Sequence, residues 1–280
     1  MRYSAALRIT LVSLTLPVLA GCSYLGDASD DGGLEDQSAT EIFRAAEEQL
    51  ADGNGKAAAQ TFNEVERLYP FSQLAKRAVI MSAFASYESA DFVEARNSAN
   101  RYLDLYPSDE DAPYAQYLIA LTYYDNIVDV GRDQATTRNA LDQLQEVVQR
   151  YPDSPFARDA QLKIDLTNDH LAAKEMDVGR YYLKRGHYAA AINRFRIVIE
   201  RYQTTNQTPE ALHRIVEANL ALGLEQEAID AAAVLGHNFK GSDWYANSYE
   251  LLTGRNLLPD EDQEGFFERT YRRVFQFKWL

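Results

Sequence analysis

The chain repeats one short frame five times, and this repetition constrains its fold more than any other feature. In each copy an alanine is followed eleven residues later by an aromatic residue. The five pairs are Ala58–Tyr69, Ala95–Tyr106, Ala140–Tyr151, Ala191–Tyr202 and Ala228–Phe239. At about 3.6 residues per turn, the alanine and the positions four, seven and eleven residues later share one stripe of a helix. Units that each offer one apolar stripe must stack to bury it.

The aromatic residue is predicted to mark the end of each helix. Proline follows it in the first three copies, at Pro70, Pro107 and Pro152. Proline lacks a backbone N–H and disfavours the helical conformation of the residue before it. Each frame is therefore expected to be the second helix of a helix–turn–helix unit. Seven positions after the alanines, core side chains are expected at Val65, Tyr102, Val147, Val198 and Leu235.

The fourth copy carries the glycine–tyrosine, alanine–phenylalanine signature of tetratricopeptide repeats, in Gly179, Tyr182, Ala191 and Phe195. The key alanines are 37, 45, 51 and 37 residues apart, more than the consensus period of about 34, so the array contains insertions. The predicted fold is all-α: a superhelical array of about five divergent tetratricopeptide repeats and a C-terminal capping helix at 242–252.

Local signals predict several boundaries. Ser154 and Thr208 each precede a proline and are expected to be N-caps. One long helix, or two in series, is expected between 155 and 186, and a surface loop at 125–137. The predicted organisation is a signal peptide (1–21), a tether (22–38), an N-terminal sub-array (39–153), a C-terminal sub-array (154–240) and an extension (241–280).

The N-terminus predicts export and lipid anchoring. Arg2 and Arg8 precede a mostly apolar stretch that is too short and too interrupted for a membrane span. Leu19-Ala20-Gly21-Cys22 resembles a bacterial lipobox, which implies that Cys22 becomes an acylated N-terminus. Cys22 is the only cysteine, so no internal disulfide is possible. The acidic, glycine-containing residues that follow predict a flexible tether. The absence of aspartate after Cys22 favours the outer membrane, by a rule carried over from enterobacterial lipoproteins.

Composition narrows the class of partner. The chain has 28 basic and 42 acidic residues, for a net charge of −14, which argues against nucleic acid and against an anionic membrane surface as partners. The four histidines show no metal-ligand spacing, and neither a phosphate-binding glycine loop nor a GxSxG elbow is present. We therefore predict no catalytic residue, no metal and no cofactor other than the lipid on Cys22.

Three short segments, taken with the lipobox and the repeats, indicate a family. They are RLYPF at 67–71, YPDS at 151–154 and YYLKRG at 181–186. The combination resembles the BamD family, lipoproteins of the outer-membrane β-barrel assembly machine, over residues 20–240. The resemblance implies a non-enzymatic scaffold at the periplasmic face of the outer membrane. It also implies binding to the POTRA domains of BamA through the C-terminal repeats, contact with other subunits, and receipt of the C-terminal segments of unfolded barrel proteins in the N-terminal repeats.

Candidate residues follow from that resemblance and from residue chemistry. An aromatic groove for substrate peptides is expected to use Phe71, Tyr87, Tyr117, Tyr123 and Tyr124, with core packing as the alternative role. Contact with BamA is expected to use Arg180, Arg194 and Arg196, with a solvated helix face as the alternative. Arg194 and Arg196 flank the core position Phe195 and should reach the surface, where a guanidinium can bond a partner's carboxylate through two nitrogens.

Two matters stay open at the level of sequence. The aromatic, basic tail at 266–280 could pack on the array as an amphipathic helix, contact another subunit or the membrane surface, or occupy the substrate groove because Phe275, Phe277 and Trp279 alternate. A periplasmic tetratricopeptide lipoprotein that positions peptidoglycan hydrolases would share the anchor and the repeats, as would an enzyme that uses the repeats as a substrate platform. The RLYPF and YYLKRG segments favour the BamD family.

Overall fold

The structure is a computed structural model that describes residues 34–258, 265 and 268–272. The chain divides into two units, 1–37 and 38–280. In the first unit only residues 34–37 are described, and Leu34–Asp36 form one turn of 3-10 helix, η1. The predicted signal peptide, Cys22 and most of the predicted tether lie outside the described residues.

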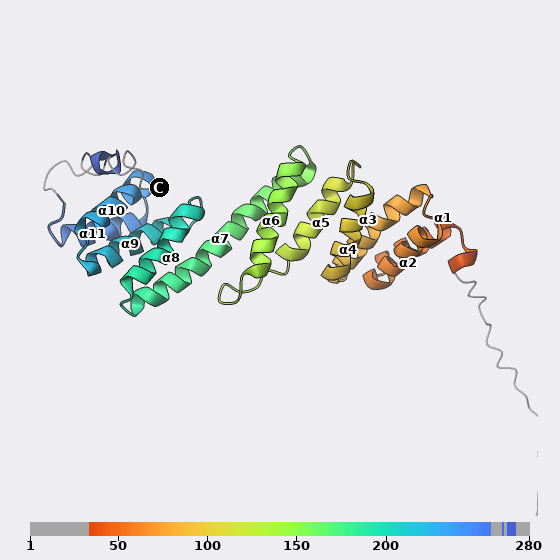
Figure 1. The fold of residues 1–280 in the computed structure, drawn as a ribbon, viewed down its shortest axis with the longest axis horizontal. Helices are drawn as coiled ribbons and strands as arrows, with labels where there is room; N and C mark the ends of the chain where they lie inside the picture. The colour runs from red at the N-terminus through yellow and green to blue at the C-terminus, as the bar shows by residue number, and fades with distance from the viewer. Residues whose placement is uncertain (1–33, 259–264, 266–267, 273–280) are drawn as a thin grey trace, which may run out of the picture. The chain divides into compact units, whose positions relative to one another are not determined.

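In the described part of the second unit the regular structure is α-helical, without strands (Figure 1). The helices are α1 (Ala39–Ala51), α2 (Gly55–Leu68), α3 (Gln73–Glu88), α4 (Phe92–Leu105), α5 (Ala112–Tyr124), α6 (Ala135–Arg150), α7 (Pro155–Lys184), α8 (Tyr188–Arg201), α9 (Thr208–Leu222), α10 (Glu225–Phe239) and α11 (Asp243–Thr253). None of these helices is both long and apolar enough to cross a bilayer.

Each helix packs against the next, from α1 to α11. Contacts also join α1 to α3, α3 to α5, α5 to α7, and α9 to α11, so the odd-numbered helices of these four pairs lie beside one another. The five frames fall on α2, α4, α6, α8 and α10, the second helix of each pair. The prediction of an all-α repeat array with a capping helix is therefore confirmed.

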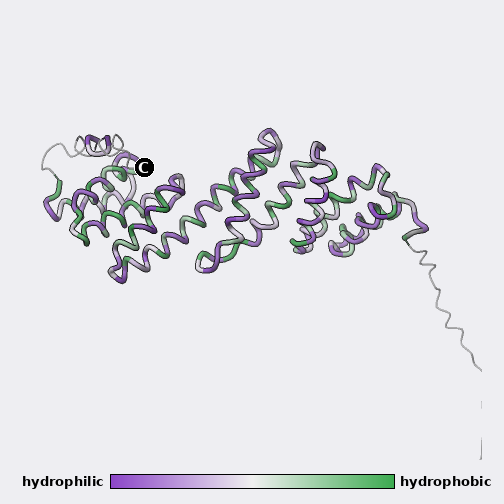
Figure 2. Tube along the Cα trace, viewed as in Figure 1, coloured by the Kyte–Doolittle hydropathy of each residue, from purple (hydrophilic) through white to green (hydrophobic). Residues whose placement is uncertain are grey.

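Burial follows the frame. All five key alanines and the five residues seven positions after them are completely buried. Polar and apolar residues are interleaved along the helices (Figure 2), as amphipathic stripes require. An alanine at the near end of the stripe lets two helix axes approach closely, and the larger residue two turns later fills the space between them.

The aromatic residues cap their helices with one shared backbone conformation. Tyr69, Tyr106, Tyr151 and Tyr202 are C-caps with φ between −133° and −129° and ψ between 39° and 55°. The backbone N–H of each donates to the carbonyl four residues earlier. Tyr202 is followed by Gln203, so this ending does not require proline. The fifth copy differs, because Phe239 is still helical and Lys240 is the C-cap.

Most boundary predictions hold, with two corrections. Helix α7 is a single helix of 30 residues, and Ser154 is its N-cap. Helix α11 is capped by the Ser242 side chain. The predicted loop at 125–137 is shorter, since α6 begins at Ala135. The prediction for Thr208 was wrong: its hydroxyl donates back to the carbonyls of Tyr202 and Gln203, so it begins α9 and Gln207 is the N-cap.

Part of the C-terminal tail packs on the array. Residues 268–272 are helical, and Thr270 is buried. The Tyr271 ring stacks on His237 of α10 with centroids 3.7 Å apart, and the His237 Nδ1 lies 3.1 Å from Glu268 Oε2. These contacts agree with the packed-tail interpretation for 268–272. Residues 273–280, including the alternating aromatics, lie outside the described residues.

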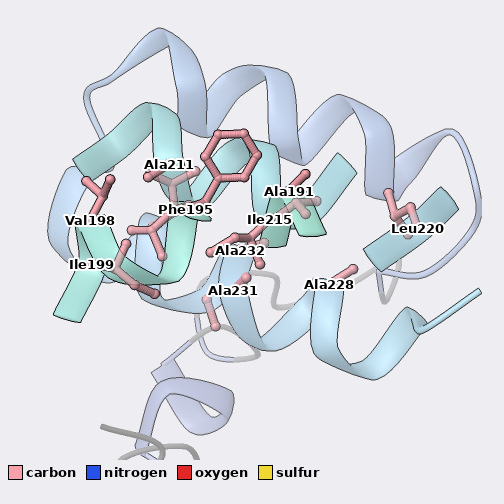
Figure 3. Packing of buried hydrophobic residues seen from close by; sticks show 14 of the residues in the cluster. Ala191, Phe195, Val198, Ile199, Ala211, Ile215, Leu220, Ala228, Ala231 and Ala232 are labelled. Carbon is pink, nitrogen blue, oxygen red and sulfur yellow. The ribbon is translucent and has the colours of Figure 1, made fainter. Parts of the chain in front are cut away.

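The tetratricopeptide signature has a direct packing explanation at α7 and α8. Phe195 is fully buried in the C-terminal core, where Figure 3 shows it with Ala191, Ala211 and Ile215. Its ring lies against Gly179, and a Cβ on Gly179 would overlap three ring atoms. Glycine is required there because the aromatic ring occupies the space of a side chain.

We predict that Gly179→Ala lowers the free energy of unfolding by about 1–3 kcal/mol, the usual cost of overpacking. Alanine gains about 1 kcal/mol of helix propensity over glycine, so a net loss shows that the clash dominates. Urea unfolding measures the change. Gly241→Ala is the control, because its Cβ would meet nothing within 4 Å. Equal stability of the two variants would contradict this account of the signature.

Candidate protein-binding surfaces

Tyrosines and carboxylates link three odd-numbered helices in what we call the aromatic–acidic face: Tyr87 of α3, Tyr117 and Tyr124 of α5, Asp125 after α5, and Asp159 of α7. The Tyr87 hydroxyl donates to Asp125, and the Tyr117 hydroxyl donates to Asp159. These bonds join α3 to the end of α5, and α5 to α7. Burial and the bonded carboxylates raise the pKa values of both tyrosines well above their usual range.

A lysine and a phenylalanine complete this surface. Lys163 of α7 lies 2.6 Å from Asp159 Oδ2 and 5.4 Å from the centre of the Tyr124 ring. Bonding to Lys163, and then to Tyr117, lowers the pKa of Asp159. Phe156 stacks on Tyr117 and packs against Tyr114, with centroids 5.2 and 5.3 Å apart. The face thus offers partly exposed rings beside carboxylates, which suits a peptide with aromatic and basic side chains.

The other two predicted groove residues lie apart from this face. Tyr123 points toward α4, where the Arg96 guanidinium lies 4.6 Å from its ring centre. Phe71 lies in the turn between α2 and α3 and is fully exposed. It stands at the opposite end of α3 from Tyr87, about 20 Å away at 1.5 Å per residue.

The exposure of Phe71 is not required by the repeat. Two residues after the frame's aromatic, the other copies have Ser108, Asp153, Thr204 and Gly241. Phe71 is therefore an exposed aromatic side chain at a position where the other copies have polar residues or glycine.

The predicted partner-contact arginines reach the surface, and Arg180 and Arg194 form ion pairs there. Arg194 and Arg196 flank the buried Phe195, and the Arg196 side chain is exposed. Arg194 lies 3.1 Å from Glu175 Oε2, and Arg180 lies 3.0 Å from Glu210 Oε2 and 2.6 Å from Asp177 Oδ1. The i, i+3 spacing of Asp177 and Arg180 was a sequence signal for pairing, whereas Glu210 depends on the packing of α9.

A second polar cluster joins α9 to the capping helix and was not foreseen from sequence. His213 is buried, and its Nδ1 is 2.8 Å from the Ser248 hydroxyl of α11. Trp244 lies between the His213 ring and the Arg214 guanidinium, at 5.3 and 5.2 Å. Arg214 in turn pairs with Glu210 and Glu217. Among the described residues, no group of three histidines, cysteines or carboxylates is placed to hold a metal ion.

This cluster predicts a pH-dependent stability. Burial lowers the pKa of His213, although Glu217 opposes the shift. The unfolded chain takes up a proton near pH 6.5 and the folded chain only at lower pH, so the unfolding free energy should fall as pH drops below about 6.5. His213→Gln should remove this component, as measured by urea unfolding between pH 5 and 8. An identical pH slope in both proteins would contradict the assignment.

Comparison with known proteins agrees with this architecture. The YfiO family model, described as "Outer membrane lipoprotein", matches residues 35–235. Proteins named outer membrane protein assembly factor BamD are similar to this chain. One from Caulobacter vibrioides is 49% identical, covering 78% of this chain and 72% of its own length. One from Rickettsia prowazekii is 40% identical, covering 84% and 92%. One from Neisseria meningitidis serogroup A is 30% identical, covering 85% and 93%.

Among solved structures, the TPR2AB-domain:pHSP90 complex of yeast Sti1 has a TM-score of 0.40 and 12% identity, covering 77% of this chain and 84% of that chain. The family match spans the helices from α1 into α10, and the three relatives named above are each at least 30% identical over most of both chains. The chain therefore belongs to the BamD (YfiO) family of outer membrane lipoproteins.

Proposed function

We propose that this chain is a lipid-anchored, non-enzymatic scaffold at the periplasmic face of the outer membrane that helps to assemble β-barrel proteins. The observation that carries the proposal is the similarity to assembly factors over most of the chain. In this proposal Cys22 carries the lipid, the C-terminal repeats hold the POTRA domains of the barrel subunit, and the N-terminal repeats receive unfolded substrates.

An uneven distribution of charge supports this division of labour. Residues 39–179 contain 24 acidic and 13 basic side chains, whereas residues 180–258 contain 8 acidic and 9 basic. The N-terminal region therefore favours basic or neutral aromatic peptides, and the C-terminal region can accept an acidic partner surface.

The substrate segment would bind in an extended conformation. About 20 Å separates Phe71 from Tyr87 along α3, and an extended chain rises about 3.3 Å per residue, so six residues span the two contacts. Alternate side chains of such a segment point the same way, so alternating aromatics could contact Phe71 at one end and the aromatic–acidic face at the other.

We predict that Phe71→Ala and Tyr124→Ala each weaken binding of a C-terminal barrel peptide with alternating aromatics at least fivefold, since each removes a ring contact worth about 1 kcal/mol or more. Fluorescence anisotropy with a labelled peptide measures the dissociation constant. Tyr181→Ala is the matched control, because Tyr181 is an exposed tyrosine of α7 outside the face.

The expected result is that Tyr181→Ala binds like the unaltered protein. Equal weakening by all three variants would mean that the peptide has no preferred site. Unchanged binding by Phe71→Ala and Tyr124→Ala would contradict the substrate groove. The scaffold role would then be tested by the partner protein that the chain binds.

The scaffold role is tested by recovering the protein from detergent-solubilised membranes and identifying what accompanies it. We expect a large barrel subunit with POTRA domains. Arg194→Glu should reduce its recovery because the substitution places a carboxylate at the contact. Cys22→Ser should release the chain from the membrane fraction, since stable attachment requires the acyl chains.

Three results would contradict the proposal in distinct ways. Recovery of cell-wall hydrolases without a barrel subunit would favour the adaptor role for peptidoglycan hydrolases. Membrane retention of the Cys22→Ser protein would contradict the lipid anchor. If the Arg194→Glu protein recovers as much barrel subunit as the unaltered protein, the contact does not involve Arg194 and lies elsewhere on the array.

A further inference from the structure

An open cavity of about 680 Å³ lies between α9 and α11. Arg214 and Glu217 line its α9 side, and Trp244, Leu251 and Arg255 line the other. Helix α11 buries Ser248 and Leu252 against the array. Trp244, Leu251 and Arg255 lie along the same stripe as Ser248 and line this space. The capping helix therefore forms one wall of a groove as well as covering the last repeat.

The two arginines of the cavity differ in their pairing. Arg214 is neutralised by Glu210 and Glu217, at 3.2 and 2.7 Å, and stacks on Trp244. Arg255 donates to the Leu220 carbonyl at 3.4 Å and meets no carboxylate among the described residues. Arg255 is thus the cation of the cavity that a ligand could neutralise. Glu250, which also lines the cavity, has no ion pair within the described part of the chain either.

The apolar contacts lie along the same helix. Trp244 stands in the first turn of α11, and Arg255 follows its last turn, about 16 Å away at 1.5 Å per residue. Leu251 lies between them and is 37% exposed. An extended segment of about five residues spans this length. A tryptophan and arginines in one concave surface have the composition of a protein-binding hot spot.

We propose that this cavity docks a partner segment that carries a carboxylate side chain and, about five residues away, an apolar or aromatic side chain. The carboxylate pairs with Arg255, and the apolar side chain covers Trp244 and Leu251. The identity of the partner rests on the proposed function: it is the acidic periplasmic surface bound by the C-terminal repeats.

Charge and continuity favour this occupant. Residues 180–258 have one more basic than acidic side chain, unlike the acidic N-terminal region. Glu210 also joins the cavity to the predicted partner contact, because its two oxygens accept from Arg180 and Arg214. A domain that contacts Arg180 would therefore also lie close to Glu210 and Arg214, and through them to the cavity lined by Trp244.

The test uses the full mature chain with the substitution Trp279→Phe. The chain has two tryptophans, so Trp244 is then the only one left. Labelling with 5-fluorotryptophan makes the fluorine signal of Trp244 specific to this protein. The probe is the soluble POTRA region of the barrel subunit. Its addition should shift the Trp244 signal, Arg255→Glu should raise the dissociation constant at least tenfold, and Leu251→Ser should raise it about fivefold.

Arg158→Glu is the matched control, because Arg158 is an exposed arginine of α7 without an ion pair among the described residues. It should change the dissociation constant less than twofold. Arg255 is exposed, so circular dichroism of Arg255→Glu should match that of the unaltered protein, and a loss of binding then reports on the contact.

Three outcomes would overturn the inference. In the first, the probe does not shift the Trp244 signal, Arg255→Glu binds the probe fully, and Arg194→Glu loses binding. This result would place the contact outside the cavity and leave the proposed function intact. No binding by the unaltered protein would remove the proposed function as well. A Trp244 shift caused by deleting residues 273–280, with none caused by the probe, would identify the chain's own tail as the occupant.

Discussion

The fold depends on the close approach of paired helices at a buried alanine, repeated at each unit. The second helix of each pair has one narrow apolar stripe, with alanine at one end and a larger residue two turns later. Such a stripe cannot be buried by its own unit, because the preceding helix covers only part of it and the next unit covers the rest. Stability is thus shared between neighbours, and the last repeat needs α11 to cover it.

This constraint explains which features were predictable from sequence. In four of the five copies the aromatic residue caps its helix with one backbone geometry, so the spacing of alanine and aromatic predicted five helices and the ends of four of them. Tyr202 shows that the aromatic cap, rather than proline, is the shared element. The pair of Gly179 and Phe195 could be predicted for the same reason, since a buried ring packed against the backbone requires glycine at that position.

The surfaces were less predictable because they depend on which side of a helix each residue occupies. Tyr123 and Tyr124 are adjacent, so they point about 100° apart on α5. One packs beneath Arg96 of α4 and the other beneath Lys163 of α7. The bonds of Tyr87 to Asp125 and of His213 to Ser248 join residues 38 and 35 positions apart. No local pattern predicts such pairs, since they form only after the helices have stacked.

Helix α7 gives the two proposed binding surfaces a fixed separation. Its N-terminal part contributes Phe156, Asp159 and Lys163 to the aromatic–acidic face, and its C-terminal part pairs Glu175 with Arg194. Gly179, its only glycine, is held against the Phe195 ring and is therefore unsuited to act as a hinge. Lys163 and Arg180 are about 25 Å apart along one continuous helix. Under the proposed function, a substrate peptide and a partner domain could bind together, because the two surfaces are separate and neither ligand must displace the other.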